Sequence, residues 1–140
     1  MIRVLVTGSN GFIGKNLLLY LAERPDVCVL PFARHDDSAR LVELVRDADI
    51  VFHLAGVNRP QDPIEFSIGN AGLTQLLAEA LAHTSSVSGK RIPVVYTSSI
   101  QAELPNAYGQ SKREAELSLF ALARQYQMPV HVFRLPNIFG

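Results

Sequence analysis

The sequence predicts an α/β fold built on a parallel β-sheet, and three observations lead to that prediction. Short apolar runs alternate with segments of helical period along the 140 residues. The first apolar run, Arg3 to Val6, leads directly into a glycine-rich turn and a helical segment. Hydrophobic residues make up 48% of the chain and charged residues 19%, which fits one globular domain with a substantial core.

The elements are predicted in order from these patterns. Strands are expected over residues 3–6, 27–33, 49–55, 92–97 and 129–134. Helices are expected over residues 11–24, 39–46, 64–83 and from about 105 to 127, with a loop over 85–90. Pro31 removes a ladder donor from the second strand, so irregular pairing is expected there. Only fifteen residues, His35 to Asp49, separate the end of the second strand from the start of the third. One strand of a full doubly wound sheet is therefore expected to be missing or vestigial.

The turn from Gly8 to Gly14 has the spacing G-x-x-G-x-x-G and predicts a Rossmann-like sheet between two helical layers. Gly8 permits the tight turn, Gly11 lets backbone N–H groups approach a pyrophosphate, and Gly14 lets the helix pack closely on the sheet. The candidate cofactor residues in this turn are Gly8, Asn10, Gly11, Phe12, Ile13 and Gly14.

Two other interpretations of this turn fit less well. A phosphate-binding P-loop needs glycine where Ser9 stands and a serine or threonine where Asn16 stands, so it fits poorly. A structural turn without a ligand would leave the cost of three glycines unexplained.

The end of the second strand predicts which dinucleotide binds. An acidic residue there would hold the ribose hydroxyls of NAD, but the sequence has Arg34. A cation suits a 2′-phosphate, so NADP(H) is predicted. NAD(H) is the alternative if Asp36 or Asp37 folds back to the ribose.

A proton-transfer site is predicted from Tyr108 and Lys112, which are four residues apart and share one helix face. A phenol with a pKa near 10 is a poor base at neutral pH, and a nearby ammonium favours its ionised form. The motif follows a strand that ends in hydroxyl residues, where ligands bind in parallel sheets. Ser99 is the predicted hydrogen-bond donor to the substrate oxygen, with Ser98 and Thr97 structural.

Two further polar residues lie in apolar surroundings. His53, within a buried strand, is interpreted as a satisfied core histidine. Asn70 lies inside a predicted helix, where it either bonds across to the active-site strands or faces solvent.

Charge and cysteine content exclude several classes of function. Thirteen basic and thirteen acidic side chains cancel, so no nucleic-acid partner is predicted. Cys28 is the only cysteine, which excludes an intrachain disulfide and a cysteine metal cluster. No signal peptide or bilayer-spanning stretch is recognisable, so a cytoplasmic enzyme without a membrane partner is expected.

Taken together, the motifs resemble the extended short-chain dehydrogenase/reductase family, also described as NAD-dependent epimerases and dehydratases, which act largely on nucleotide sugars. The resemblance spans the whole chain in family order. It is carried by residues 7–14, His53-Leu54-Ala55-Gly56, Ser98-Ser99, Tyr108 with Lys112, and residues 134–140.

Residues 52–60, 98–102 and 134–137 are most similar to a subgroup that builds bacterial capsule and O-antigen polysaccharides. That resemblance implies an NADPH-dependent reductase of a 4-keto UDP-deoxysugar on the route to UDP-N-acetyl-L-fucosamine. It also implies additional roles: Ala55, Gly56, Val57 and Pro136 toward the cofactor, and Arg59, Gln101 and Asn137 toward the substrate.

The same resemblance implies that residues 1–140 are an NADP-binding domain cropped from a longer homodimeric protein. The family's substrate lobe and the subgroup's cupin domain would then follow Gly140. Epimerisation or dehydration by the same site, and a non-catalytic dinucleotide-binding module, are the alternatives. A dehydratase usually has an acid pair after the active-site serine, whereas this chain has Ile100 and Gln101, which favours reduction.

Overall fold

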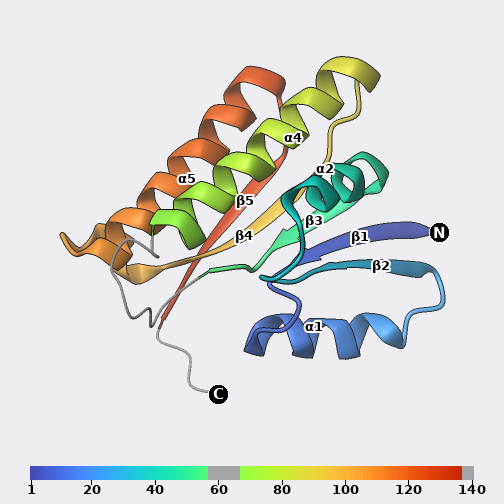
Figure 1. Ribbon diagram of the computed structural model, residues 1–140, viewed down its shortest axis with the longest axis horizontal. Coiled ribbons are helices and arrows are strands. Elements are labelled where there is room, and N and C mark those ends of the chain that lie inside the picture. Colours follow the sequence, from blue (N-terminus) through green and yellow to red (C-terminus); the bar gives the residue numbers. More distant parts are fainter. Residues whose placement is uncertain (57–66, 137–140) are drawn as a thin grey trace.

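The computed structural model describes residues 1–56 and 67–136, and within them one parallel sheet forms the centre of the molecule (Figure 1). The sheet has five strands in the order β2-β1-β3-β4-β5. The strand bounds are β1 Ile2–Thr7, β2 Val27–Phe32, β3 Ile50–His53, β4 Val94–Ser99 and β5 Val130–Leu135.

Helices cover both faces of this sheet. Figure 1 shows α1 (Phe12–Ala22) on one face and α2 (Ser38–Asp47), α4 (Leu73–Ser88) and α5 (Ala107–Tyr126) on the other. The predicted three-layer, Rossmann-like architecture is therefore confirmed. None of the helices among the described residues is long and apolar enough to cross a membrane.

Each face of the sheet has its own apolar core. The larger core lies under the three helices and includes Leu5, Leu41, Leu77 and Leu119, all of them 0–1% exposed. The smaller core lies under α1, where Val4, Val6 and Leu21 are buried. Alternate residues of β1 thus point into different cores, as expected for a strand buried on both faces.

Local sequence sets where the helices around the site begin. The Asp37 side chain accepts the backbone N–H of Ala39 at the start of α2, and the Asn106 side chain accepts that of Gly109 at the start of α5. A 3-10 turn, Ile100–Glu103, connects β4 to the segment before α5. These caps fix the two helices at the carboxyl edge of the sheet.

Two local predictions were wrong. Pairing of β1 with β2 continues without a break through Pro31, which lies opposite Val6. The reason is that β2 is an edge strand, and the Pro31 carbonyl faces Arg40 Nη2 at 3.5 Å, away from β1. Residues 85–88 belong to α4 instead of a loop, and Gly89, with a φ of 74°, ends that helix.

The expectation of a shortened sheet agrees with the topology. Within residues 1–56 and 67–136, no strand pairs with the outer edge of β2, where a full doubly wound sheet would continue. The chain passes from β2 to β3 through α2 alone.

Candidate functional site

The turn between β1 and α1 is so tight that it excludes a side chain at two of its positions, Gly8 and Gly14. Gly8 has a φ of 70°, and a Cβ added to it would lie 2.7 Å from the Ala55 backbone nitrogen. A Cβ on Gly14 would collide with the Gly8 carbonyl oxygen. The first glycine therefore permits a close approach of β1 to the segment after β3. The third glycine permits α1 to begin in direct contact with the Gly8 carbonyl.

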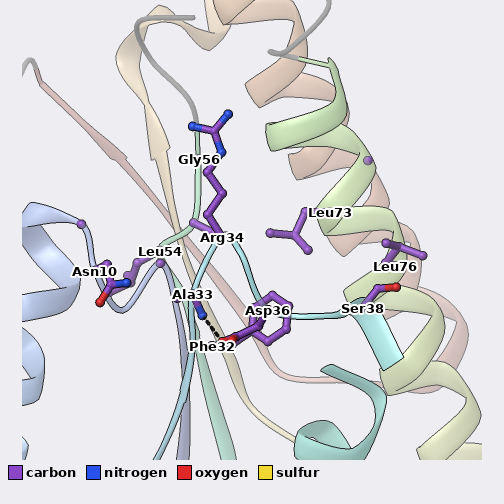
Figure 2. A pocket seen from close by; sticks show the side chains of 14 residues that line it. Asn10, Phe32, Ala33, Arg34, Asp36, Ser38, Leu54, Gly56, Leu73 and Leu76 are labelled. Carbon is purple, nitrogen blue, oxygen red and sulfur yellow. Dashed lines mark hydrogen bonds between the residues drawn. The ribbon is translucent and has the colours of Figure 1, made fainter. Parts of the chain in front are cut away.

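A cavity of about 690 Å³ opens above this turn (Figure 2). Its size is that of a ligand site for a molecule larger than a single nucleotide base. Six of the predicted cofactor residues line it, namely Gly8, Asn10, Gly11, Arg34, Ala55 and Gly56. Phe12, Ile13, Gly14 and Pro136 are not among its lining residues.

The opposite wall of the cavity was not identified from the sequence. It is apolar and comes from Leu73 and Leu76 of α4, while Phe32 and Leu54 line the cavity at the ends of β2 and β3. Figure 2 shows Leu73 and Leu76 across the cavity from Asn10 and Leu54. A glycine turn on one side and apolar walls around it fit the pyrophosphate and the adenine of a dinucleotide.

Arg34 and Asp36 extend from the end of β2 in different directions (Figure 2). Asp36 also lines the cavity, and one of its carboxylate oxygens accepts the backbone N–H of Ala33 at 2.7 Å. Arg34 is exposed, lines the cavity, and has no ion-pair partner among the described residues. At this strand end the cavity is thus lined by one cation, Arg34, and by one carboxylate that also bonds to its own loop.

The predicted proton-transfer residues lie on adjoining elements at the carboxyl edge of β4. Ser99 is the last residue of β4, and its hydroxyl accepts the Gln101 backbone N–H at 3.1 Å. Tyr108 lies in the first turn of α5, and Lys112 follows one turn later. A Cβ on Gly109 would collide with the Gln101 carbonyl, so the helix start packs directly on the 3-10 turn after Ser99.

The Lys112 ammonium is buried, with the residue only 5% exposed. It donates to the Thr97 carbonyl at 3.0 Å and lies 4.8 Å from the centre of the Tyr96 ring. Burial lowers the pKa of Lys112 to about 8, and the negative charge of Glu116 opposes that shift. The ammonium is therefore still the main form at neutral pH.

Glu116 and Arg134 form a second charged group beside the site, which sequence reasoning missed. Arg134 donates to both Glu116 carboxylate oxygens, at 2.9 and 2.8 Å, and the Ser98 hydroxyl donates at 2.5 Å. Burial acts to raise the pKa of Glu116, but these hydrogen bonds outweigh burial and hold it below its usual value. The group joins β4, α5 and β5. The signal available in the sequence was the spacing from Lys112 to Glu116, one helical turn.

Gly56 is where the cavity meets the proton-transfer residues. It lines the cavity, and a Cβ added to it would lie 3.4 Å from Lys112 Nζ and 2.8 Å from Asn70 Oδ1. The Lys112 ammonium therefore lies directly behind Gly56, although Lys112 itself is not one of the lining residues. Gln101 lies in the 3-10 turn. The predicted residues Val57, Arg59 and Asn137 lie outside the described residues.

The sheet order, the glycine turn and the cavity at the carboxyl edge define an α/β domain of the Rossmann type. The model of the NAD dependent epimerase/dehydratase family matches residues 4–140. The chain belongs to that family, whose members bind nicotinamide dinucleotides.

One curated relative is 54% identical over 138 residues, the UDP-2-acetamido-2,6-beta-L-arabino-hexul-4-ose reductase of Pseudomonas aeruginosa strain PA103. The alignment covers 99% of this chain and 36% of that reductase. The UDP-glucose 4-epimerase of Vibrio cholerae is 26% identical, with 98% of this chain and 52% of the epimerase covered. The chain thus spans between about a third and a half of these relatives.

Solved structures also match along nearly the whole chain. The capsular polysaccharide assembling protein CapF of Staphylococcus aureus is 36% identical with a TM-score of 0.81, over 98% of this chain and 36% of CapF. The Bordetella bronchiseptica enzyme WbmF, solved in complex with NAD+, is 27% identical with a TM-score of 0.80, over 99% of this chain and 51% of WbmF.

Proposed function

We propose that the protein containing this chain is an NADPH-dependent reductase of a 4-keto UDP-deoxysugar. The observation that carries the proposal is the position of Gly56, which lines the cavity above the glycine turn and lies next to the buried Lys112 ammonium. The 54% identity to a reductase whose name describes a UDP-hexulose supports the substrate class.

Each part of the described site has its own role in such a reaction. The glycine turn and the apolar walls hold the dinucleotide, and the reduced nicotinamide, when bound, supplies a hydride to the carbonyl carbon. The Tyr108 hydroxyl gives a proton to the carbonyl oxygen as that oxygen gains charge, and the Ser99 hydroxyl donates a hydrogen bond to it. The Lys112 ammonium stabilises the ionised tyrosine that results.

The first test is substitution of the proposed proton donor in the full-length protein. With NADPH and a 4-keto UDP-deoxysugar, Tyr108→Phe is expected to lower kcat roughly 10²- to 10⁴-fold and to leave NADPH affinity unchanged, because only the proton donor is lost. Oxidation of NADPH, followed by its absorbance, measures turnover, and fluorescence titration measures affinity.

Tyr126→Phe is the matched control, since Tyr126 is the last residue of α5 and lies away from the cavity. Normal reduction by Tyr108→Phe would show that another group donates the proton. Interconversion of sugar epimers without net oxidation of NADPH would instead identify an epimerase.

We also propose that Arg34 selects NADP(H) over NAD(H). Arg34 and Asp36 both line the cavity, but one Asp36 carboxylate oxygen is engaged by the Ala33 N–H, so Arg34 is the charged group better placed to bind a 2′-phosphate. Arg34→Ala is expected to weaken NADPH binding about 10- to 100-fold, the worth of a charge-assisted hydrogen bond, and to change NADH binding little. Titration with both dinucleotides checks this, and equal losses for the two would contradict it.

The partners and compartment follow from the same proposal. The substrate is a nucleotide sugar, the enzyme acts in the cytoplasm, and the complete protein is a homodimer. Leu117 and Phe120 support the dimer, because they are 59% and 38% exposed and share one face of α5.

A further inference from the structure

A chain of buried polar side chains connects β1 with α4 through His53. The imidazole Nδ1 lies 2.7 Å from the Thr7 hydroxyl, and its Nε2 lies 2.7 Å from the Thr74 hydroxyl. All three residues are 0% exposed. Both ring nitrogens of this buried imidazole are thereby satisfied, and the two hydroxyls that satisfy them come from two different elements.

The hydrogen bonds of this chain can run in only one direction. The Thr7 hydroxyl already accepts the N–H groups of Leu54 and Ala55, at 3.1 and 3.2 Å, so its own proton goes to His53 Nδ1. His53 must then carry its proton on Nε2 and donate it to the Thr74 hydroxyl. Burial lowers the pKa of His53 to about 3, which keeps the ring in this neutral form.

The chain continues from Thr74 to the helix that bears Tyr108. The Thr74 hydroxyl donates to the Asn70 carbonyl at 2.7 Å. Asn70 lies in a π-helical segment, Ser67–Gly72, and its amide donates to the Ser111 hydroxyl at 2.9 Å. Ser111 in turn donates to the Tyr108 carbonyl at 2.7 Å.

The two ends of this chain lie at the two halves of the site. Its first donors, Leu54 and Ala55, line the cavity, and Thr7 directly precedes Gly8 of the glycine turn. Its last acceptor is the backbone carbonyl of Tyr108. Hydrogen bonds, joined through the Asn70 residue itself, therefore run from Ala55 at the cavity to the first turn of α5.

We propose that His53 is a positioning residue that couples the dinucleotide cavity to Tyr108, so that binding at Ala55 and Gly56 fixes the first turn of α5. The inference rests on the proposed dinucleotide site and adds to it a route between cofactor and proton donor. Thr74 is the link best suited to a test, because its hydroxyl both accepts from His53 and donates to Asn70.

The test compares Thr74→Val, which removes that hydroxyl at nearly constant volume, with Thr74→Ser, which keeps it. Hydrogen exchange of residues 107–112 is measured in the full-length protein with and without NADPH, beside the NADPH dissociation constant. Wild type and Thr74→Ser are expected to gain protection in this segment on binding. Thr74→Val is expected to bind NADPH within about threefold of wild type and to gain none.

Ser111→Ala provides a second cut in the chain that favours helix formation, in case Thr74→Val does not fold. Thr84→Val, at another buried threonine of α4, is the control and should behave as wild type. Full NADPH-induced protection in Ser111→Ala or in folded Thr74→Val would overturn the coupling while leaving the proposed function intact. A wild-type protein that binds no dinucleotide would overturn both.

Discussion

Lys112 shows at the scale of one residue how function and stability oppose each other. Its ammonium is charged and buried, and its folded-state pKa of about 8 lies below the ordinary 10.5. A difference of that size corresponds to a burial cost on the order of 3 kcal/mol at neutral pH. This net cost remains although the negative charge of Glu116 opposes the effect of burial.

We expect Lys112→Met to unfold at a higher temperature than wild type at pH 7, with a free energy of unfolding larger by about 1–3 kcal/mol. Between pH 8 and 10.5 the folded protein binds fewer protons than the unfolded chain. The free energy of unfolding of the wild type therefore rises with pH over this interval, as the destabilisation caused by the charged Lys112 is lost. The gap between variant and wild type should therefore shrink over that interval. Thermal unfolding at several pH values measures it.

Lys15→Met is the control for this measurement, because Lys15 is exposed on α1. The interpretation would be wrong if Lys112→Met were less stable than wild type at pH 7 by an amount that pH did not change. Activity should be lost in Lys112→Met and kept in the control.

His53 and Asn70 show how far single residues can be predicted. A histidine inside an apolar run indicated a buried core position, and His53 is fully buried. The sequence left open whether Asn70 bonds across or faces solvent, and the Asn70 amide donates to Ser111 of α5. The series of hydrogen bonds that contains both residues could not be predicted. Its members lie up to 104 positions apart, from Thr7 to Ser111, and sequence spacing says nothing about such contacts.

At the scale of elements, the sharpest prediction concerns a substitution in the glycine turn. A Cβ on Gly14 meets the Gly8 carbonyl, whereas a Cβ on Gly89 meets nothing within 4 Å although Gly89 has a φ of 74°. Gly14→Ala is expected to lower the free energy of unfolding by roughly 2–4 kcal/mol and to weaken NADPH binding at least tenfold, because the turn must open.

Gly89→Ala is the matched control, since it adds backbone strain alone. It should cost about 1 kcal/mol and leave NADPH affinity unchanged. Denaturant unfolding and dinucleotide titration measure both quantities. Equal losses of stability and affinity in the two variants would show that the close approach at Gly14 is unimportant.

The order and type of the elements followed from local patterns, because each strand is a short apolar run and each helix has a periodic apolar face. All five predicted strands exist, with ends shifted by a few residues. The predictions failed where contacts between distant elements determine the local structure. Pro31 tolerates regular pairing only because β2 is an edge, and the wall formed by Leu73 and Leu76 depends on how α4 packs over the turn.

At the scale of the whole molecule, α5 serves the site with one face and presents apolar side chains on another. Replacing both Leu117 and Phe120 by Glu is expected to convert the proposed dimer to monomers without loss of helix content, because both are exposed in the single chain. Sedimentation of the full-length protein measures this. Leu19→Glu, at a 71% exposed position on α1, should remain dimeric. A double variant that still sediments as a dimer would place the contact elsewhere.

The outer edge of β2 bears on how the sheet meets other molecules. A strand edge with open N–H and carbonyl groups is a template on which a second molecule can add its own strand. Here Pro31 contributes no donor on the outer side, and Arg40 reaches over its carbonyl. Pro31, from which irregular pairing was predicted, thus disfavours the pairing of this edge with a strand of another molecule.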